Sequence, residues 1–255
     1  PTALRAAPVF PLNALAPEDS GTAALRRHLH DAAAHNPVRQ DEALFRIAVD
    51  RVFTLTGHGV VTTGTVFSGK IRTGDTLVVM PSGKPARVRG IHAQNQASDS
   101  GHAGQRCAIN VAGVDKDSIS RGDWLADPRL FAPTTRIDVR LRLLAGSNLR
   151  LASWTPLHVH MGTTHRIAHV VPLESDTLSA GDSERVQLVF DAPVCATCGD
   201  RFIARDAQAA HTVGGGVVID PYAPSRKRRS VERMRHLDSL ERMIAGDGIA
   251  PLLQH

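Results

Sequence analysis

The stretch FRIAVDRVFTLTGHGVVTTGT, residues 45–65, decides the fold of this chain. It continues as VFSGKIRTGDTLVV, residues 66–79, and the whole segment is dense in Val and Thr and broken by glycines. β-Branched residues favour strands, and Gly marks the turns between them. The stretch therefore predicts two strands, 47–54 and 60–67, joined through Gly57, His58 and Gly59 in a tightly wound antiparallel barrel.

Further strands are predicted at the even spacing that is typical of a barrel. They cover residues 76–80, 86–92, 105–111 and 123–125. With a polar linker at 37–44, the first barrel domain is predicted over residues 37–131.

A second series of strands begins after the linker Ala132-Pro133-Thr134. Apolar Ile137, Val139, Leu141 and Leu143 alternate with polar Asp138, Arg140 and Arg142, which is the period of a half-buried strand. Further strands are predicted at 156–161, 164–172, 185–190, 201–205 and 212–220. The fold class is therefore mainly β, with two consecutive antiparallel β-barrels, the second over residues 132–222.

The two ends have a different character. Residues 1–36 predict a strand at 7–12, a loop, and a helix at 21–34 that Ser20 caps and Asn36-Pro37 ends. These elements cannot bury a core alone, so we interpret them as the last part of a larger α/β domain, with an arm packed on the barrel as the alternative. Residues 223–255 predict a linker and a helix at 230–244 that starts a helical region. Because the chain opens on Pro1 and has no signal region, we interpret it as a fragment.

Composition narrows the functional classes. The hydrophobic content is 42%, without an apolar run long enough for a membrane span, and the three cysteines are too few for a disulfide framework. This predicts a cytoplasmic protein with no membrane partner. The net charge of +5 favours polyanionic partners, and the 4% aromatic content favours backbone recognition over base stacking.

The ordered blocks of this sequence resemble a translational GTPase of the elongation factor Tu class. The residues that carry the resemblance include Asp50-Arg51-Val52-Phe53, Thr62-Thr63-Gly64-Thr65, Ala103-Gly104-Gln105-Arg106, Gly162-Thr163-Thr164 and Phe202-Ile203-Ala204-Arg205. Within that class, residues 87–95, 119–125 and 214–221 are most similar to the bacterial selenocysteine-specific elongation factor. In this reading, residues 1–36 are the end of the GTPase domain and 223–255 lead to winged-helix domains.

The resemblance implies a translation elongation factor, acting as a monomer, that delivers selenocysteinyl-tRNA to the ribosome at a recoded stop codon. It also implies GTP and Mg²⁺ as cofactors, and a messenger RNA hairpin as partner of missing C-terminal domains. Asn13-Ala14-Leu15 is similar to the loop that touches guanine, with Asn in the place of Ser. The sequence contains neither a Gly-x-x-x-x-Gly-Lys-Ser/Thr phosphate loop nor an Asn-Lys-x-Asp motif, so we expect no GTP hydrolysis by this chain.

The resemblance also implies two binding sites. The aminoacyl pocket would use Asp50, Arg51, Phe53, His58, Thr63 and Arg106. The tRNA backbone would meet Thr163, Thr164, His165, Arg166, Arg205, His211, Gly214, Gly215 and Gly216. The alternative is that the charged residues are ordinary surface groups and that the three glycines mark a bulge or barrel corner.

Two further segments have competing interpretations. Cys195 and Cys198 supply half of a tetrahedral zinc site, for which His158, His160, His165 or His211 would have to complete the ligands. The basic run Arg226-Lys227-Arg228-Arg229 is either a solvated linker or a contact with RNA phosphates. The rival functions are therefore a stand-alone RNA-binding pair of barrels without nucleotide chemistry, and a small zinc protein.

Overall fold

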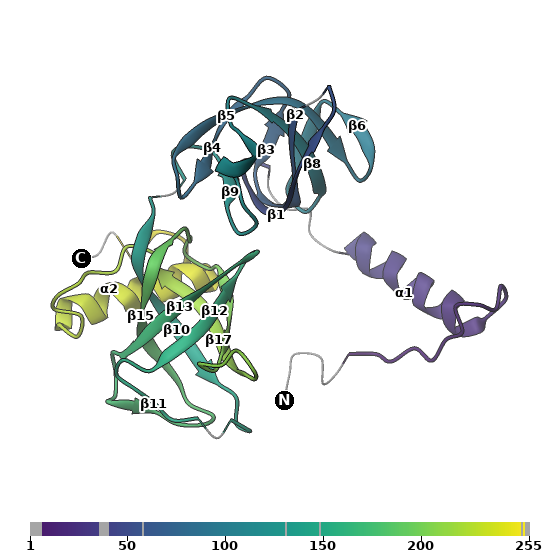
Figure 1. The fold of residues 1–255 in the computed structure, drawn as a ribbon. Helices are drawn as coiled ribbons and strands as arrows, with labels where there is room; N and C mark the ends of the chain where they lie inside the picture. Colours follow the sequence, from purple (N-terminus) through teal and green to yellow (C-terminus); the bar gives the residue numbers. More distant parts are fainter. Residues whose placement is uncertain are drawn as a thin grey trace. The chain divides into compact units, whose positions relative to one another are not determined.

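The computed structural model describes residues 7–35, 41–57, 59–130, 132–147, 149–250 and 252. The chain divides into two compact units, residues 1–39 and residues 40–255. The second unit holds two closed antiparallel barrels (Figure 1), which confirms the predicted mainly β fold class. No helix in the described ranges is long and apolar enough to cross a membrane.

The first unit is built on helix α1 (Ser20–His35). Asp19 caps it, because its carboxylate accepts a hydrogen bond from the Thr22 amide at 2.7 Å, whereas the predicted cap Ser20 is the first helical residue. The predicted strand at 7–12 is wrong: residues 7–13 have no regular secondary structure. A lone strand gains ladder hydrogen bonds only from a neighbouring strand. Instead this segment packs on α1, where a Cβ at Gly21 would lie 1.9 Å from the Pro11 carbonyl oxygen.

The first barrel closes in the order β4, β9, β1, β2, β8, β5, with β5 pairing back to β4. Its strands are β1 (Arg46–Leu55), β2 (Gly59–Ser68), β4 (Thr76–Met80), β5 (Lys84–Ala93), β8 (Arg106–Ala112) and β9 (Trp124–Ala126). Inward side chains such as Val49, Ile109 and Leu125 form its core. Gly64 lets β1 and β2 approach closely, since a Cβ there would lie 2.0 Å from the Ala48 carbonyl oxygen.

Several short elements of this barrel were absent from the sequence prediction. They are β3 (Lys70–Arg72), β6 (Gln96–Ser98), β7 (Ser100–His102) and the 3-10 turn η2 (Lys116–Ser118). Each of these elements is three residues long, which is too short for a periodic pattern of apolar residues to reveal it in the sequence.

The second barrel closes in the order β10, β15, β13, β12, β16, β17. Its strands are β10 (Thr134–Leu143), β12 (Pro156–Met161), β13 (Thr164–Pro172), β15 (Ser183–Val194), β16 (Arg201–Arg205) and β17 (Thr212–Asp220), and a ribbon of β11 (Leu151–Ala152) and β14 (Thr177–Leu178) lies beside them. The predicted inward residues Ile137, Val139, Leu141 and Leu143 of β10 are all fully buried.

Asp138 departs from the predicted alternation, because it is fully buried although it lies on the polar side of β10. Helix α2 (Val231–Arg242), which runs into the π-turn η3 (Met243–Asp247), supplies its partner. The Arg233 guanidinium donates to Asp138 at 3.0 Å, and Gln187 donates to it at 2.9 Å. Leu237 and Leu240 of α2 are buried in one cluster with Leu173 and Ile219. The C-terminal helix therefore packs on the second barrel.

The basic run before α2 is partly fixed on the barrel. Arg229 donates to the Pro172 carbonyl oxygen at 2.9 Å and pairs with Asp176 at 3.2 Å. Arg226 and Lys227 are exposed. The last residue of the run is therefore anchored on the barrel, while contact of the run with RNA phosphates stays a prediction.

The two barrels meet through an ion pair and an apolar cluster. Arg46 on β1 donates two hydrogen bonds to Asp200 of the second barrel, at 2.7 and 2.8 Å. The Arg46 guanidinium lies 5.2 Å from the ring centroid of Trp124, and Trp124 is buried in a cluster with Cys195. The contact thus combines a charge-assisted pair with desolvated aromatic surface.

Candidate functional site

A β-bulge on strand β1 positions the first candidate site. Val49 pairs with Gly64 and Arg51 pairs with Thr63, so Asp50 is an extra residue between two regular pairs. The bulge lets the Asp50 carboxylate reach the outer face of β2, where it accepts a hydrogen bond from the Thr63 hydroxyl at 2.6 Å. A single unpaired residue therefore carries the carboxylate at this site.

Arg106, the first residue of β8, completes a three-residue cluster with Asp50 and Thr63. Its guanidinium forms an ion pair with Asp50 and donates to the Thr63 hydroxyl at 3.3 Å. This guanidinium, followed by the Thr63 hydroxyl, holds the pKa of Asp50 below its usual range, and Asp50 in turn raises the pKa of Arg106. The side chain of Arg106 is still 52% exposed, so donors remain for a ligand.

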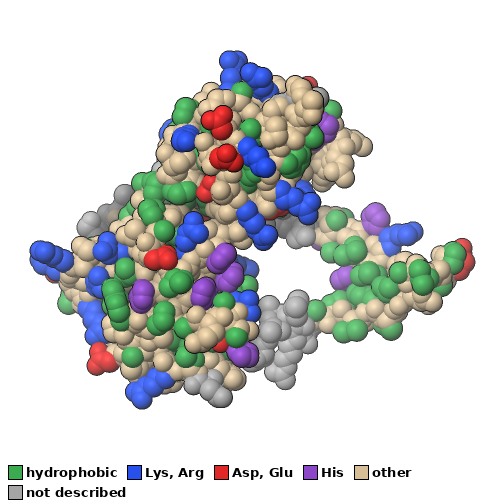
Figure 2. All heavy atoms as spheres, in the orientation of Figure 1, with side chains coloured by type: hydrophobic (Ala, Val, Ile, Leu, Met, Phe, Trp, Pro, Cys, Tyr) green, Lys and Arg blue, Asp and Glu red, His purple; other side chains and the backbone are tan. Residues whose placement is uncertain are grey.

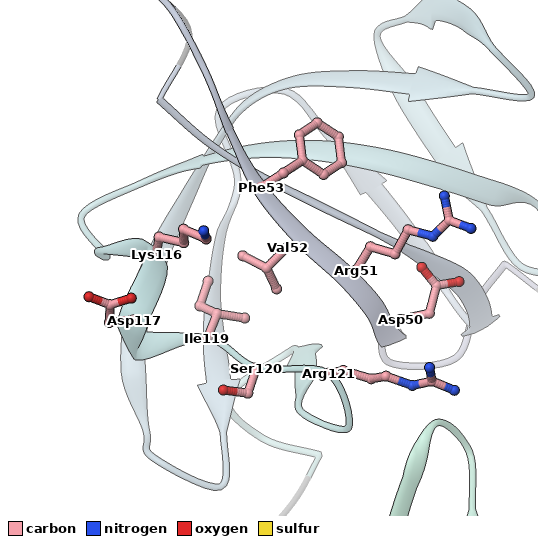
Figure 3. A pocket seen from close by; sticks show the side chains of 9 residues that line it. All are labelled: Asp50, Arg51, Val52, Phe53, Lys116, Asp117, Ile119, Ser120 and Arg121. Carbon is pink, nitrogen blue, oxygen red and sulfur yellow. The ribbon is translucent and has the colours of Figure 1, made fainter.

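An open groove of about 670 Å³ runs along β1 beside this cluster. Its walls come from two segments, Asp50, Arg51, Val52 and Phe53 on β1, and Lys116, Asp117, Ile119, Ser120 and Arg121 on the η2 turn and the loop after it. Figure 3 shows the apolar side chains of Val52 and Ile119 at its centre, with Arg51 and Arg121 at one end and Lys116 at the other. Three cations (Arg51, Lys116 and Arg121) and two acids (Asp50 and Asp117) flank this apolar floor, and the excess of cations suits a ligand that is partly apolar and anionic.

The structure thus brings five of the six predicted pocket residues to one side of the first barrel. Arg51 and Phe53 line the groove, and Thr63 and Arg106 hold Asp50 at its edge. His58, the sixth, lies outside the described residues.

The η2 side of the groove was not predicted from the sequence. Residues 119–125 contributed to the family resemblance but were not assigned to the pocket. The available signal in the sequence for an ordered loop here was Asp123, because Asp often fixes a turn through its side chain. In the structure its carboxylate accepts a hydrogen bond from the Ser120 amide at 2.8 Å.

The predicted backbone-binding residues of the second barrel separate into three groups. Thr163 and Thr164, at the β12–β13 turn, lie against the first barrel: the Thr163 hydroxyl donates to the Val49 carbonyl oxygen at 2.8 Å. A Cβ at Gly122 would lie 3.0 Å from the Thr164 hydroxyl oxygen. These two residues therefore contribute to the contact between the barrels.

The glycines of β17 have a packing role. A Cβ would lie 2.4 Å from the Arg142 carbonyl oxygen at Gly214, 2.6 Å from the Phe202 carbonyl oxygen at Gly215, and 1.8 Å from the Arg140 carbonyl oxygen at Gly216. Strand β17 pairs with β10 on one side and β16 on the other, so the three residues sit inside the barrel wall. This supports the structural alternative for the glycines, while their contact with tRNA stays a prediction.

The remaining predicted residues lie around β13 and β16. His165 and Arg205 sit on strands that flank β12, and Arg205 donates to the Ala210 carbonyl oxygen at 3.0 Å. Exposed His211 pairs with Asp206 at 3.1 Å in the loop after β16. Arg166 is exposed and donates to the His165 carbonyl oxygen at 3.3 Å. Of these four residues, His165, Arg166 and His211 are exposed and Arg205 is half-buried.

The two C-terminal cysteines lie in different environments. Cys195 is buried between the barrels, whereas Cys198 packs in the cluster under α2. Burial raises the pKa of Cys195 to about 12 and that of Cys198 to about 11, so both are neutral thiols at pH 7. Among the described residues, no three His, Cys, Asp or Glu side chains are grouped to hold a metal ion.

Comparison with known sequences identifies the family. The β-barrel domain of selenocysteine-specific elongation factor matches residues 134–225, and domain 2 of elongation factor Tu matches residues 59–126. Over 228 residues, or 89% of its length, the chain is 40% identical to the selenocysteine-specific elongation factor of Escherichia coli strain K12. The chain belongs to the selenocysteine-specific elongation factor family.

Other members of the selenocysteine-specific elongation factor family match nearly the whole chain. The Desulfomicrobium baculatum factor is 32% identical over 250 residues, or 98% of this chain. The chain spans 35% of the Escherichia coli factor and 38% of the Desulfomicrobium factor, a little more than a third of their length.

Two solved structures share the fold. A bacterial selenocysteine-specific elongation factor, EF-Sec, superposes with a TM-score of 0.74 at 20% identity, covering 92% of this chain and 37% of that one. The apo form of translation elongation factor SelB from Methanococcus maripaludis gives a TM-score of 0.70 at 22% identity, with 81% and 49% covered. At these low sequence identities, the structural similarity supports a shared fold.

Proposed function

We propose that this chain is the part of a selenocysteine-specific elongation factor that holds the aminoacyl end and the backbone of selenocysteinyl-tRNA. The observation that carries the proposal is the Arg106 guanidinium, which Asp50 and Thr63 hold at the edge of the groove on the first barrel. The groove would take the aminoacyl ester, and the second barrel would take the tRNA backbone.

The chemistry of the two amino acids explains why a fixed cation matters. A selenol has a low pKa and is an anion at neutral pH, as a low-pKa thiol is, whereas the serine hydroxyl is neutral. A guanidinium is always charged and presents its donors in a rigid fork. Arg106, with Arg51 and Arg121 lining or flanking the groove, would therefore favour selenocysteine over serine on the same tRNA.

The rest of the activity is proposed from the family. Names of the relatives identify them as selenocysteine-specific elongation factors, which supports delivery of the charged tRNA to the ribosome in the cytoplasm. GTP with Mg²⁺ would act through residues outside this sequence, because the sequence contains no phosphate-loop motif.

The test compares the affinity of the chain for selenocysteinyl-tRNA with its affinity for the same tRNA charged with serine. Arg106→Ala should remove a preference of roughly tenfold to a hundredfold, because a hydrogen bond to a charged group contributes about 1.5–3 kcal/mol. Arg89→Ala, an exposed arginine on β5 of the same barrel, is the matched control and should keep the preference. Equal affinity of the unaltered chain for both tRNAs would refute the proposal.

A further inference from the structure

Histidine side chains gather on the second barrel (Figure 2). Cross-strand pairing arranges six residues of β13, β12 and β16 in two rows: Ile167, His158 and Arg205 in one, and His165, His160 and Ile203 in the other. Cross-strand partners share one face of a sheet, and the residues that alternate with them, such as Leu157 and Val159, are in the core. We call these six residues the histidine face.

The centre of the histidine face is a stacked pair of imidazoles. The rings of His160 and His165 lie 5.6 Å apart between centroids, with 21° between their planes. The Nε2 atom of His160 is buried and has no hydrogen-bond partner among the described residues. Burial, followed by the charges of His165, Arg205 and His158, lowers the pKa of His160 below its usual value, so His160 is neutral at pH 7.

The surrounding charges are nearly all positive or able to become so. His165 on β13, Arg205 on β16 and His158 on β12 itself act on His160. Neither row of the histidine face contains an Asp or a Glu. The carboxylate of Asp206, in the loop after β16, accepts hydrogen bonds from the Ala210 and His211 amides and pairs with the His211 ring. Arg166 alternates away from the face and interacts with Asp123.

The histidine face contains no anionic side chain to balance its positive charges. Protonating both stacked imidazoles next to an arginine is unfavourable in free energy, because each positive charge disfavours the others. A phosphate placed against the face would supply the missing negative charge and favour protonated rings. A protonated histidine then donates from both ring nitrogens.

We propose that the histidine face binds RNA phosphates and that the His160–His165 pair gains a proton as the phosphates dock. The inference rests on the proposed function, which brings tRNA to the second barrel through His165 and Arg205, and it adds His158, His160 and a proton to that contact. RNA fits better than an acidic peptide, because the exposed isoleucines Ile167 and Ile203 offer apolar contact to sugars between the cations.

The experiment measures binding of a labelled double-stranded RNA that carries no aminoacyl group to the chain by fluorescence anisotropy at fixed ionic strength. The pH is varied from about 5 to about 8, where histidines titrate. Affinity should rise as pH falls, by up to about tenfold per pH unit for each proton taken up. His160→Gln and, separately, His165→Gln should flatten this slope, and His92→Gln, an exposed histidine of the first barrel, should leave it unchanged.

Proton uptake is measured independently by calorimetry in buffers of different ionisation enthalpy, and by the NMR titration of the His160 ring with and without RNA. An upward shift of the His160 titration on adding RNA supports the proposal. A slope that is the same in the unaltered chain and in both variants, or tighter binding of polyglutamate than of RNA, would overturn it. Failure of the proposed function would appear separately, as loss of discrimination between selenocysteinyl-tRNA and seryl-tRNA at one pH.

Discussion

Among single residues, Asp50 connects the strands that form the first candidate site. Because it occupies a β-bulge, its carboxylate reaches both Thr63 and Arg106, which lie on the next strands of the barrel. An acid inside an arginine-rich site looks contrary to anion binding. Its role is geometric, since it fixes one side of the Arg106 fork and leaves the exposed side for a ligand.

The Asp50 ion pair predicts a change in acid stability. The Arg106 guanidinium lowers the pKa of Asp50, so the ionised pair stabilises the fold above the ordinary carboxyl pKa, about 3.9, and this contribution is lost as pH falls through the lower value of the folded state. Asp50→Asn should cost about 0.2–1 kcal/mol at pH 7, because the pair is partly exposed, and nearly nothing in strong acid. Urea unfolding at both pH values measures this.

The matched control for that experiment is Asp117→Asn, an exposed acid of the same groove. It should change the free energy of unfolding by less than about 0.5 kcal/mol at either pH. An equal loss at pH 7 and in strong acid for Asp50→Asn would contradict the ion-pair account and point to the altered bulge instead.

At the scale of elements, strand β17 shows why three successive glycines are needed in a barrel wall. Each glycine lies under a carbonyl oxygen of a neighbouring strand. Gly216→Ala should therefore lower the free energy of unfolding by roughly 2–4 kcal/mol, since an added Cβ at 1.8 Å from the Arg140 oxygen forces the strands apart. Thermal unfolding followed by circular dichroism measures it.

Gly90→Ala on β5 is the control for the glycine substitution. A Cβ there meets nothing within 4 Å, so the expected change is below about 1 kcal/mol. Similar effects of the two substitutions would mean that backbone entropy, and not the close approach of strands, explains the glycines.

Helix α2 offers a second prediction for an element. The Asp138 side chain is fully buried and that of Arg233 is 10% exposed, and Arg233 also pairs with Asp220 at 2.7 Å. Arg233→Ala should cost about 3 kcal/mol, because it leaves buried carboxylates without a counter-charge. Arg235→Ala, exposed on the same helix, should cost less than about 0.5 kcal/mol. Equal values for the two variants would show that α2 does not stabilise the barrel through this pair.

The long strands could be predicted from the sequence, but the packing of α2 could not. Alternation of apolar and polar residues is local, and it placed Ile137, Val139, Leu141 and Leu143 correctly in the core. Whether the polar side of β10 faces water or a helix depends on residues about a hundred positions later, which no local pattern contains. Asp138 therefore looked like a surface residue. The strand predicted at 7–12 failed for the related reason that a strand is defined by its partner.

At the scale of the whole molecule, the contact between the barrels involves residues that were predicted to meet tRNA. Thr163 was expected to meet tRNA, yet its hydroxyl is engaged by the Val49 carbonyl oxygen. Proximity of Arg106 to Asp50 followed from the family resemblance, whereas the η2 side of the groove required the fold. A contact between domains depends on residues from both domains, so the local sequence of either domain does not predict it.

The contact itself is tested by Arg46→Ala in a Trp154→Phe background, where Trp124 is the remaining tryptophan of the chain's two. Loss of the Arg46–Asp200 hydrogen bonds and of the cation over the indole should loosen the contact and expose Trp124, which is 3% exposed. A red shift of the emission and stronger acrylamide quenching are expected. Arg89→Ala in the same background should leave the spectrum unchanged, and an unchanged spectrum in Arg46→Ala would refute the coupling.

Cys195 allows the rate at which the two barrels separate to be measured. Its thiol is 3% exposed between the barrels, whereas Cys107 is 1% exposed inside the first barrel. An alkylating reagent can reach Cys195 when the barrels part, but it reaches Cys107 only when the first barrel unfolds. The difference between the two alkylation rates therefore measures how often the intact barrels separate, without an engineered cysteine.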